Sequence, residues 1–153
     1  GSESFVENKL LPFIDDVDGN GKKKILVESY YIIVGKSGAA AETVQMNRAK
    51  LIAKLNKNDA FLYMVDGATY QDMKDLGVVF KDLTDISDSN RVDGDRYSLK
   101  DTNFAKELQL SDSSDEMYLC LIDYDGFAQK DKESIKEIYN NDMALLKSII
   151  AYN

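Results

Sequence analysis

The most regular feature of the chain is a set of short apolar runs separated by polar, helix-patterned segments. Three runs rich in β-branched and aromatic residues predict strands, at Ile25–Val34, Phe61–Val65 and Met117–Asp123. Val78–Phe80 is a shorter fourth candidate. Because the three longer runs are apolar enough to be covered on both faces, we expect them to share one sheet.

Between these runs, apolar residues recur at helical spacing. Two long helices are predicted over Ala39–Asn56 and Lys132–Tyr152, and two shorter ones over Tyr70–Leu76 and Thr102–Leu108. Gly77 is placed to close the helix Tyr70–Leu76. Strands that alternate with helices predict a single α/β domain over residues 1–153. The expected architecture is a three-layer sandwich, with a mostly parallel central sheet and helices on both faces.

The apolar stripes of the long helices should face this sheet. On the first helix the stripe consists of Val44, Arg48, Leu51, Ile52 and Leu55, and on the last helix of Ile135, Ile138, Tyr139, Leu145, Leu146 and Ile149. Asp82–Tyr97, in contrast, is rich in Asp, Ser, Asn and Gly, a composition typical of a loop.

Composition removes several classes of function. The 153 residues carry a net charge of −8, which repels nucleic-acid phosphates and anionic lipid, so neither is an expected partner. There is no histidine, which excludes His-based catalytic triads and His-ligated metals. The single cysteine, Cys120, lies in an apolar run and is expected to be a buried packing residue. We therefore predict that the protein is not an enzyme.

One turn has the oxygen-rich pattern of a calcium loop. Side-chain oxygens alternate from Asp16, and a glycine permits the tight turn. An EF-hand is excluded because Val27 occupies the position of its bidentate acid and a strand follows. A looser calcium site would use Asp16, Asp18, Asn20, the carbonyl of Lys22 and Glu28. The alternative is a plain turn whose Asp and Asn side chains bond their own backbone. Calcium is the one cofactor that the sequence offers.

Two predicted strands run directly into acidic residues and glycine. In open α/β sheets, ligands bind outside the carboxyl ends of the strands, so Asp66, Asp123 and Tyr124 are the candidate ligand-binding residues, with the segment Asp82–Tyr97 beside them. The alternative is that these acids cap helices and fill turns. The expected ligand is an unidentified small molecule, peptide or protein.

Several stretches resemble a known family. Asn58–Asp66 followed by Tyr70–Asp85 is similar to a segment of bacterial extracellular solute-binding proteins, and Arg96–Lys100 and Glu116–Ile122 continue the likeness. Together with the Asp16 turn and the strand after it, the pattern resembles uncharacterised membrane-anchored proteins of Gram-positive gut bacteria. The resemblance spans about Asp16 to Asn153 and implies one lobe of a binding protein, located outside the cytoplasm.

These observations predict a non-enzymatic extracytoplasmic binding or interaction domain, in the form of a degenerate solute-binding lobe. Two alternatives stay open, namely a structural cell-surface module stiffened by the calcium-type loop and an enzyme of unrecognised type. The leading Gly1-Ser2 resembles a cloning scar. We therefore expect an extracellular or cell-surface location, with anchoring by an N-terminal segment that has been removed and no membrane contact by the domain itself.

Overall fold

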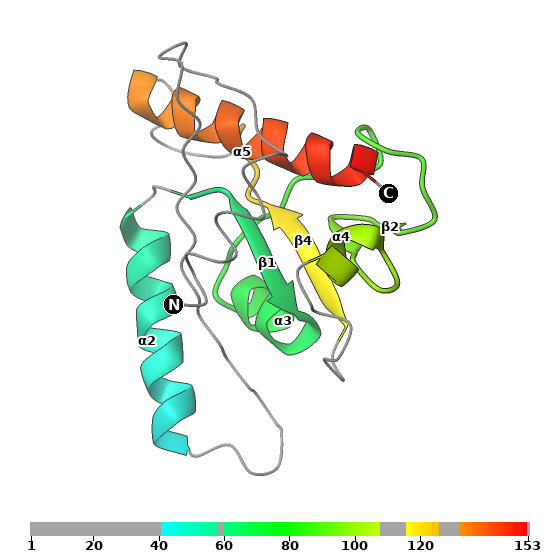
Figure 1. Cartoon of the computed structure of the whole chain (residues 1–153). Helices are drawn as coiled ribbons and strands as arrows, with labels where there is room; N and C mark the ends of the chain where they lie inside the picture. Colours follow the sequence, from blue (N-terminus) through cyan, green and yellow to red (C-terminus); the bar gives the residue numbers. More distant parts are fainter. Residues whose placement is uncertain (1–40, 58–59, 108–115, 126–131, 153) are drawn as a thin grey trace.

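The computed structural model describes residues 41–57, 60–107, 116–125 and 132–152 of the chain (Figure 1). Within these ranges four strands form one sheet in the order β1-β4-β3-β2. Their bounds are Leu62–Asp66 for β1, Val92–Asp93 for β2, Arg96–Ser98 for β3 and Met117–Leu121 for β4. The predicted strand Ile25–Val34 and the Asp16 loop lie outside the described residues.

Every pair of neighbouring strands in this sheet is antiparallel. β1 pairs with β4 from Leu62 opposite Leu121 to Asp66 opposite Met117. β3 pairs with the other edge of β4, with Tyr97 opposite Leu119, and β2 pairs with β3. The expected mostly parallel sheet is therefore wrong: the chain is α/β with a four-strand, all-antiparallel sheet.

The error has a physical reason. The apolar runs of β1 and β4 report that both faces are covered, but strand direction is set by the connections. After α3, the chain passes beside the end of β4, where the Lys81 amide donates to the Leu121 carbonyl at 2.7 Å and a single bridge joins Phe80 to Ile122. It then turns through the β2–β3 hairpin, where Gly94 adopts the positive φ of 63° that a two-residue loop requires.

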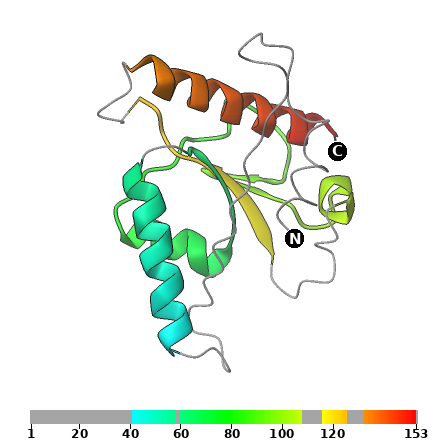
Figure 2. The same cartoon turned by 60° about the vertical axis from the view of Figure 1, so that its left-hand side comes forward.

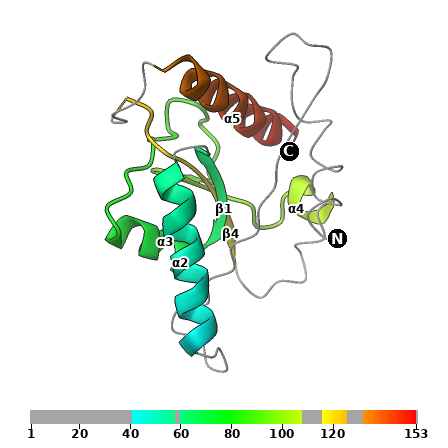
Figure 3. The same cartoon turned by 90° about the vertical axis from the view of Figure 1, so that its left-hand side faces the viewer.

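Helices pack on both faces of the antiparallel sheet (Figures 2 and 3). α2 (Ala41–Lys57) and α3 (Gly67–Asp75) lie on one side of it, and α4 (Asn103–Glu107) and α5 (Glu133–Tyr152) on the other. Side chains of β4 alternate accordingly: Leu119 and Leu121 belong to the core under α5, and Cys120 belongs to the core under α3.

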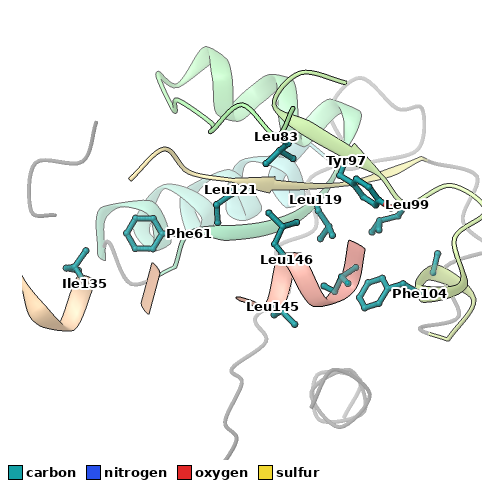
Figure 4. Close-up of a cluster of buried hydrophobic side chains, with 12 residues drawn as sticks. Phe61, Leu83, Tyr97, Leu99, Phe104, Leu119, Leu121, Ile135, Leu145 and Leu146 are labelled. Atoms are coloured by element: carbon teal, nitrogen blue, oxygen red, sulfur yellow. The ribbon is translucent and has the colours of Figure 1, made fainter. Parts of the chain in front are cut away.

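The larger core fills the space between the sheet, α4 and α5 (Figure 4). Its members are Phe61, Leu83, Tyr97, Leu99, Phe104, Ala105, Leu119, Leu121, Ile135, Leu145, Leu146 and Ile149, all at most 7% exposed. Ile135, Leu145, Leu146 and Ile149 confirm most of the stripe predicted for the last helix. The segment after α3 is anchored in this core by the buried side chains of Leu83 and Tyr97, although the composition around them is typical of a loop.

The smaller core under α2 and α3 differs in one respect from the predicted stripe. Leu51 is buried there, but Ile52 is 40% exposed, so its predicted place on the buried stripe is wrong. Arg48 belongs to the same face because it forms a two-pronged ion pair with Asp72 of α3, with N···O distances of 2.5 and 3.0 Å. This pair joins the two helices through a carboxylate that is itself buried.

Local signals for α3 are strong, and the predicted helix is confirmed. Its N-terminus is capped by Asp66, whose side chain accepts a hydrogen bond from the Thr69 amide at 2.8 Å. At its other end Gly77 adopts a φ of 94°, and the Val78 amide donates back to the Met73 carbonyl. The cap and the closing glycine fix the two ends of α3 and, with them, the positions of Tyr70 and Lys74 on the helix.

Candidate functional site

A group of aromatic and charged side chains gathers where α3 meets the β2–β3 hairpin. We call it the tyrosine–arginine cluster. It consists of Tyr70 and Lys74 from α3, Asp93, Asp95 and Arg96 from the hairpin, Glu116, which directly precedes β4, and Tyr118 of β4. These segments are far apart in sequence, so the cluster is a product of the fold.

Simple periodicities explain why these side chains meet. Tyr70 and Lys74 are four residues apart on α3 and therefore lie on one face of the helix. On β3, Tyr97 points into the larger core, so its neighbour Arg96 points to the opposite face. On β4, Tyr118 precedes the core residue Leu119 and faces the same side as Arg96.

Tyr70 is held by its hydroxyl. That hydroxyl donates a 2.5 Å hydrogen bond to Asp95 Oδ1, and Lys74 Nζ donates to Asp95 Oδ2 at 3.1 Å and to the Tyr70 oxygen at 3.2 Å. Behind it, the ring stacks on Phe80 with centroids 5.6 Å apart and planes 13° from parallel. The Tyr70 side chain is thus fixed at its tip and along its face.

Arg96 lies against two aromatic rings. Its Cζ atom is 4.7 Å from the centroid of Tyr70 and 4.2 Å from that of Tyr118, within the range of cation–π attraction. The Nε and Nη2 atoms donate to Asp93 Oδ2 at 3.2 and 3.0 Å. A quarter of the Arg96 side chain is exposed, while that of Asp93 is 73% exposed. The guanidinium therefore sits at the surface in a defined orientation.

Tyr118 has an anchor of its own. Its hydroxyl donates to Glu116 Oε2 at 2.9 Å, and the hydroxyl of Ser98 on β3 donates to the other oxygen of the same carboxylate. Glu116 is exposed, yet both of its oxygens are engaged by neighbouring strands. The two tyrosines of the cluster are thus fixed by different carboxylates.

The pKa values of the two tyrosines and of Glu116 are shifted away from neutral pH. Burial, reinforced by the hydrogen bond to Asp95, raises the pKa of Tyr70. Burial and the hydrogen bond to Glu116 likewise raise the pKa of Tyr118. The hydrogen bonds from Ser98 and Tyr118 lower the pKa of Glu116. At neutral pH the cluster therefore presents neutral phenols, a charged guanidinium and an ionised carboxylate.

Cys120 lies beneath this region and confirms the packing role predicted for it. Its side chain is fully buried in the smaller core, and burial raises the pKa of the thiol to about 12. Thiol reactivity requires the thiolate, so this residue offers no nucleophile near neutral pH.

The three residues predicted to bind a ligand lie at two ends of the sheet. Asp66 pairs with Met117, whereas Asp123 and Tyr124 follow the far end of β4. Because β1 and β4 are antiparallel, their carboxyl ends do not meet, and the premise that placed these residues together is wrong. Ligand binding by any of them individually stays a prediction.

Each of these residues has a local partner. Asp66 caps α3, and Asp123 Oδ1 accepts from the Asp125 amide at 3.2 Å, as in an Asx turn. Tyr124 stacks on Tyr139 with centroids 4.5 Å apart and makes an edge-type contact with the ring of Phe61. The contacts of the two acids correspond to the capping and turn roles that formed the alternative interpretation.

Sequence reasoning missed Arg96 and the role of its neighbours. Asp93 and Asp95 lie in the segment Asp82–Tyr97, which was expected to be a loop, and Tyr118 lies in the apolar run Met117–Asp123, which was expected to be a buried strand. The available signal was the order Asp93-Gly-Asp-Arg96, in which a glycine-containing pair between polar residues marks a hairpin. With the hairpin recognised, the alternation of side chains along β3 would have placed Arg96 on the face of the sheet that points away from the larger core.

The described ranges contain neither a cluster of metal ligands nor a membrane-spanning helix. No group of three or more Cys, Asp or Glu side chains there is arranged to hold a metal ion. No helix in those same ranges is both long and apolar enough to cross a membrane. The predicted calcium ligands Asp16, Asp18, Asn20, Lys22 and Glu28 fall outside these ranges, so that site stays a prediction.

Comparison with models of known protein families, with curated proteins and with solved structures finds no match to the chain. The resemblance to solute-binding lobes therefore stays an expectation from the sequence.

Proposed function

We propose that the chain is a non-enzymatic binding or interaction domain, and that the tyrosine–arginine cluster is the centre of its recognition surface. The observation that carries this proposal is Arg96, a partly exposed guanidinium held against the rings of two tyrosines. Tyrosine and arginine are the residue types that dominate binding energy at protein interfaces. Side chains that are already oriented also lose less conformational entropy when a partner binds.

The protonation states of the cluster support a binding role over a catalytic one. A general base needs a pKa near the working pH, and both tyrosine pKa values move away from it. The Cys120 thiol is buried, with a pKa of about 12. What the cluster offers is non-covalent chemistry, namely hydrogen bonds, charge and ring faces.

Location and partner follow from the sequence as further proposals. The resemblance to extracellular solute-binding lobes supports a place on the cell surface. A net charge of −8 disfavours nucleic acid and anionic membranes and leaves a small molecule, a peptide or a protein as the partner. Calcium bound by the Asp16 loop would be an accessory to this function.

One observation favours a second candidate, a structural module. The cluster residues satisfy one another: Asp95 bonds Tyr70 and Lys74, and Asp93 bonds Arg96. Such pairing would also suit a clasp that holds the hairpin on α3. A clasp and a recognition surface differ in whether Arg96 affects ligand binding or only stability.

The proposal is tested by a thermal-shift screen of sugars, peptides and metal ions, repeated on variants. Arg96→Ala should abolish the shift caused by a ligand that binds the cluster, while Lys147→Ala, an exposed cation on α5, should leave it unchanged. If a ligand no longer shifts the Tm of Asp66→Ala or of Tyr124→Ala but still shifts that of Arg96→Ala, the binding site lies outside the cluster. Turnover of any substrate by the purified protein would overturn the non-enzymatic assignment.

A further inference from the structure

The backbone of β1 is hydrogen-bonded to β4 along one of its two edges. In an antiparallel pair, alternate residues direct both their N–H and their C=O groups at the partner strand. The Ile122 amide donates to the Phe61 carbonyl at 2.8 Å, and continuing the register of the pair directs Tyr63 at β4 as well. Leu62 and Met64 therefore direct their backbone groups at the opposite edge, which we call the outer edge of β1.

The outer edge begins with a hydrogen bond to α5. The Leu62 amide donates to Asp142 Oδ2 at 3.0 Å, on the side away from β4. Beyond this bond, β1 is the last strand in the order β1-β4-β3-β2, so in the part of the chain that the structure describes no strand pairs with the outer edge. The N–H and C=O groups of Met64 form the centre of this edge. Such a row of backbone groups is suited to pairing with another strand.

The side chains of β1 have the character of an interior strand. Tyr63 and Val65 are 9% and 6% exposed in the smaller core, and Leu62 and Met64 pack partly buried against the larger core. Native edge strands are commonly very short, charged or interrupted by proline, because an open apolar edge promotes aggregation. β2, at the other edge of the sheet, is two residues long and ends in an exposed aspartate. Residues 62–65 carry no charge, so β1 is the edge that calls for a further neighbour.

α2 lies toward the outer edge of β1. Figures 1 and 2 both place it on the side of β1 that faces away from β4, and Figure 1 shows it running in the opposite direction to β1. Its buried residue Leu51 reaches the smaller core, and Arg48 is paired with Asp72 of α3. In an α/β layer, a helix in this position covers both β1 and a strand beside it.

The order of elements along the chain supplies that strand. Ile25–Val34, the predicted strand that lies outside the described residues, is joined to α2 by residues 35–40, and residues 58–61 join α2 to β1. Connections of this length are common between strands and helices. A strand, a helix that returns antiparallel to it and a second strand form a βαβ unit, in which the two strands are parallel. Consecutive strands are neighbours in the sheet in most cases.

The segment Ile25–Val34 also fits the edge in length and composition. α2 has 17 residues and therefore spans about 25 Å. A strand of the length of Ile25–Val34 spans about 33 Å, enough to run alongside the whole helix. Its β-branched and aromatic residues suit a strand that is covered by α2. A short covalent connection also gives the segment an effective concentration in the millimolar range, which favours it over a strand from another molecule.

We propose that the outer edge of β1 is a docking edge and that its occupant is Ile25–Val34 of the same chain, paired parallel to β1. The segment adds one parallel strand to a sheet that is otherwise antiparallel. Docking closes this edge to strands of other molecules, so a partner has to be recognised by side chains. This inference goes beyond the proposed recognition surface and does not depend on Arg96, so either can fail without the other.

Amide hydrogen exchange, followed by NMR on the full chain, tests whether the edge is occupied. The Tyr63 amide points at β4 and serves as an internal reference for the Met64 amide, which points at the outer edge. With the segment docked, both amides are hydrogen-bonded in the sheet, so their protection factors should agree within about tenfold. A Met64 amide that is less protected than Tyr63 by more than this factor would show an open edge and overturn the proposal.

Prolines within the segment identify what protects Met64. Neighbouring residues of a strand face opposite edges, so Tyr30→Pro combined with Tyr31→Pro removes a donor to β1 whichever of the two faces it. The exchange rate of Met64 relative to that of Tyr63 should then rise by at least about tenfold. A loss of stability that both amides share leaves this ratio unaffected. If the ratio stays at its wild-type value, Ile25–Val34 is not the occupant.

A control variant and a direct observation complete the experiment. Lys22→Pro combined with Lys23→Pro places the same two prolines just before the segment and should leave the exchange ratio unchanged; an equal rise in this variant would refute docking by the segment itself. In wild-type protein, nuclear Overhauser contacts between the segment and β1 should ascend both strands together. Contacts that run in opposite directions would contradict the parallel pairing. Contacts found only between differently labelled molecules in a mixed sample would make a second copy the occupant and overturn the proposal.

Discussion

Leu146 provides a quantitative test of how α5 packs on the sheet. Its side chain is fully buried, in the core that also contains Leu119 and Leu121 of β4 (Figure 4). Leu146→Ala removes three buried carbon groups, worth about 2.4 kcal/mol at about 0.8 kcal/mol each. The cavity left in a core with little room to relax brings the expected loss of unfolding free energy to about 3–4 kcal/mol.

The assay is urea unfolding followed by circular dichroism, with Leu76→Ala as the matched control. Leu76 undergoes the same chemical change, but its side chain is 42% exposed at the end of α3, so the expected loss is below about 1 kcal/mol. Both variants should keep the wild-type m-value. If the two variants lose stability equally, or if Leu146→Ala loses less than about 1 kcal/mol, the packing of α5 described above is wrong.

Three other residues give independent checks. Asp101 adopts a φ of 60°, so Asp101→Val should cost roughly 1–2 kcal/mol in urea unfolding, whereas Asp85→Val, at an ordinary φ, should change little. Cys120 should resist a thiol reagent at pH 8 until urea unfolds the chain, and rapid labelling of native protein would contradict its burial. The raised pKa of Tyr70 means that the folded state holds this proton more tightly than the unfolded state. Its contribution to stability is therefore complete below about pH 10 and lost as the pH rises through the folded-state pKa, so Tyr70→Phe should flatten the alkaline decline in Tm.

Local features of the sequence predicted individual elements well. The apolar stripe of the last helix, the glycine that closes α3 and the burial of Cys120 each depend on contacts near in sequence or on simple periodicity. Strand direction could not be predicted in the same way. The apolar residues of β4, among them Leu119 and Leu121, indicate that helices cover the strand. The same apolar pattern occurs in strands with parallel neighbours and in strands with antiparallel neighbours.

The cluster was hidden for a related reason. Tyr70, Arg96 and Tyr118 are brought together by the antiparallel register of β3 on β4 and by the return of the hairpin over α3. Because parallel strands were expected, the candidate site was placed at the carboxyl ends of β1 and β4, where Asp66 and Tyr124 lie. The segment Asp82–Tyr97 was expected to be a loop, whereas the buried side chains of Leu83 and Tyr97 anchor it in the larger core.

The most direct test of a pre-oriented recognition surface is a crystal structure of Arg96→Ala. If Asp95 and Glu116 hold the two tyrosines without help from Arg96, the rings of Tyr70 and Tyr118 should keep a centroid separation close to the 6.5 Å of the intact protein. Their hydroxyls should still donate to Asp95 and Glu116. Collapse of the two rings onto one another, or release of either hydroxyl from its carboxylate, would show that Arg96 builds the site and would contradict the account.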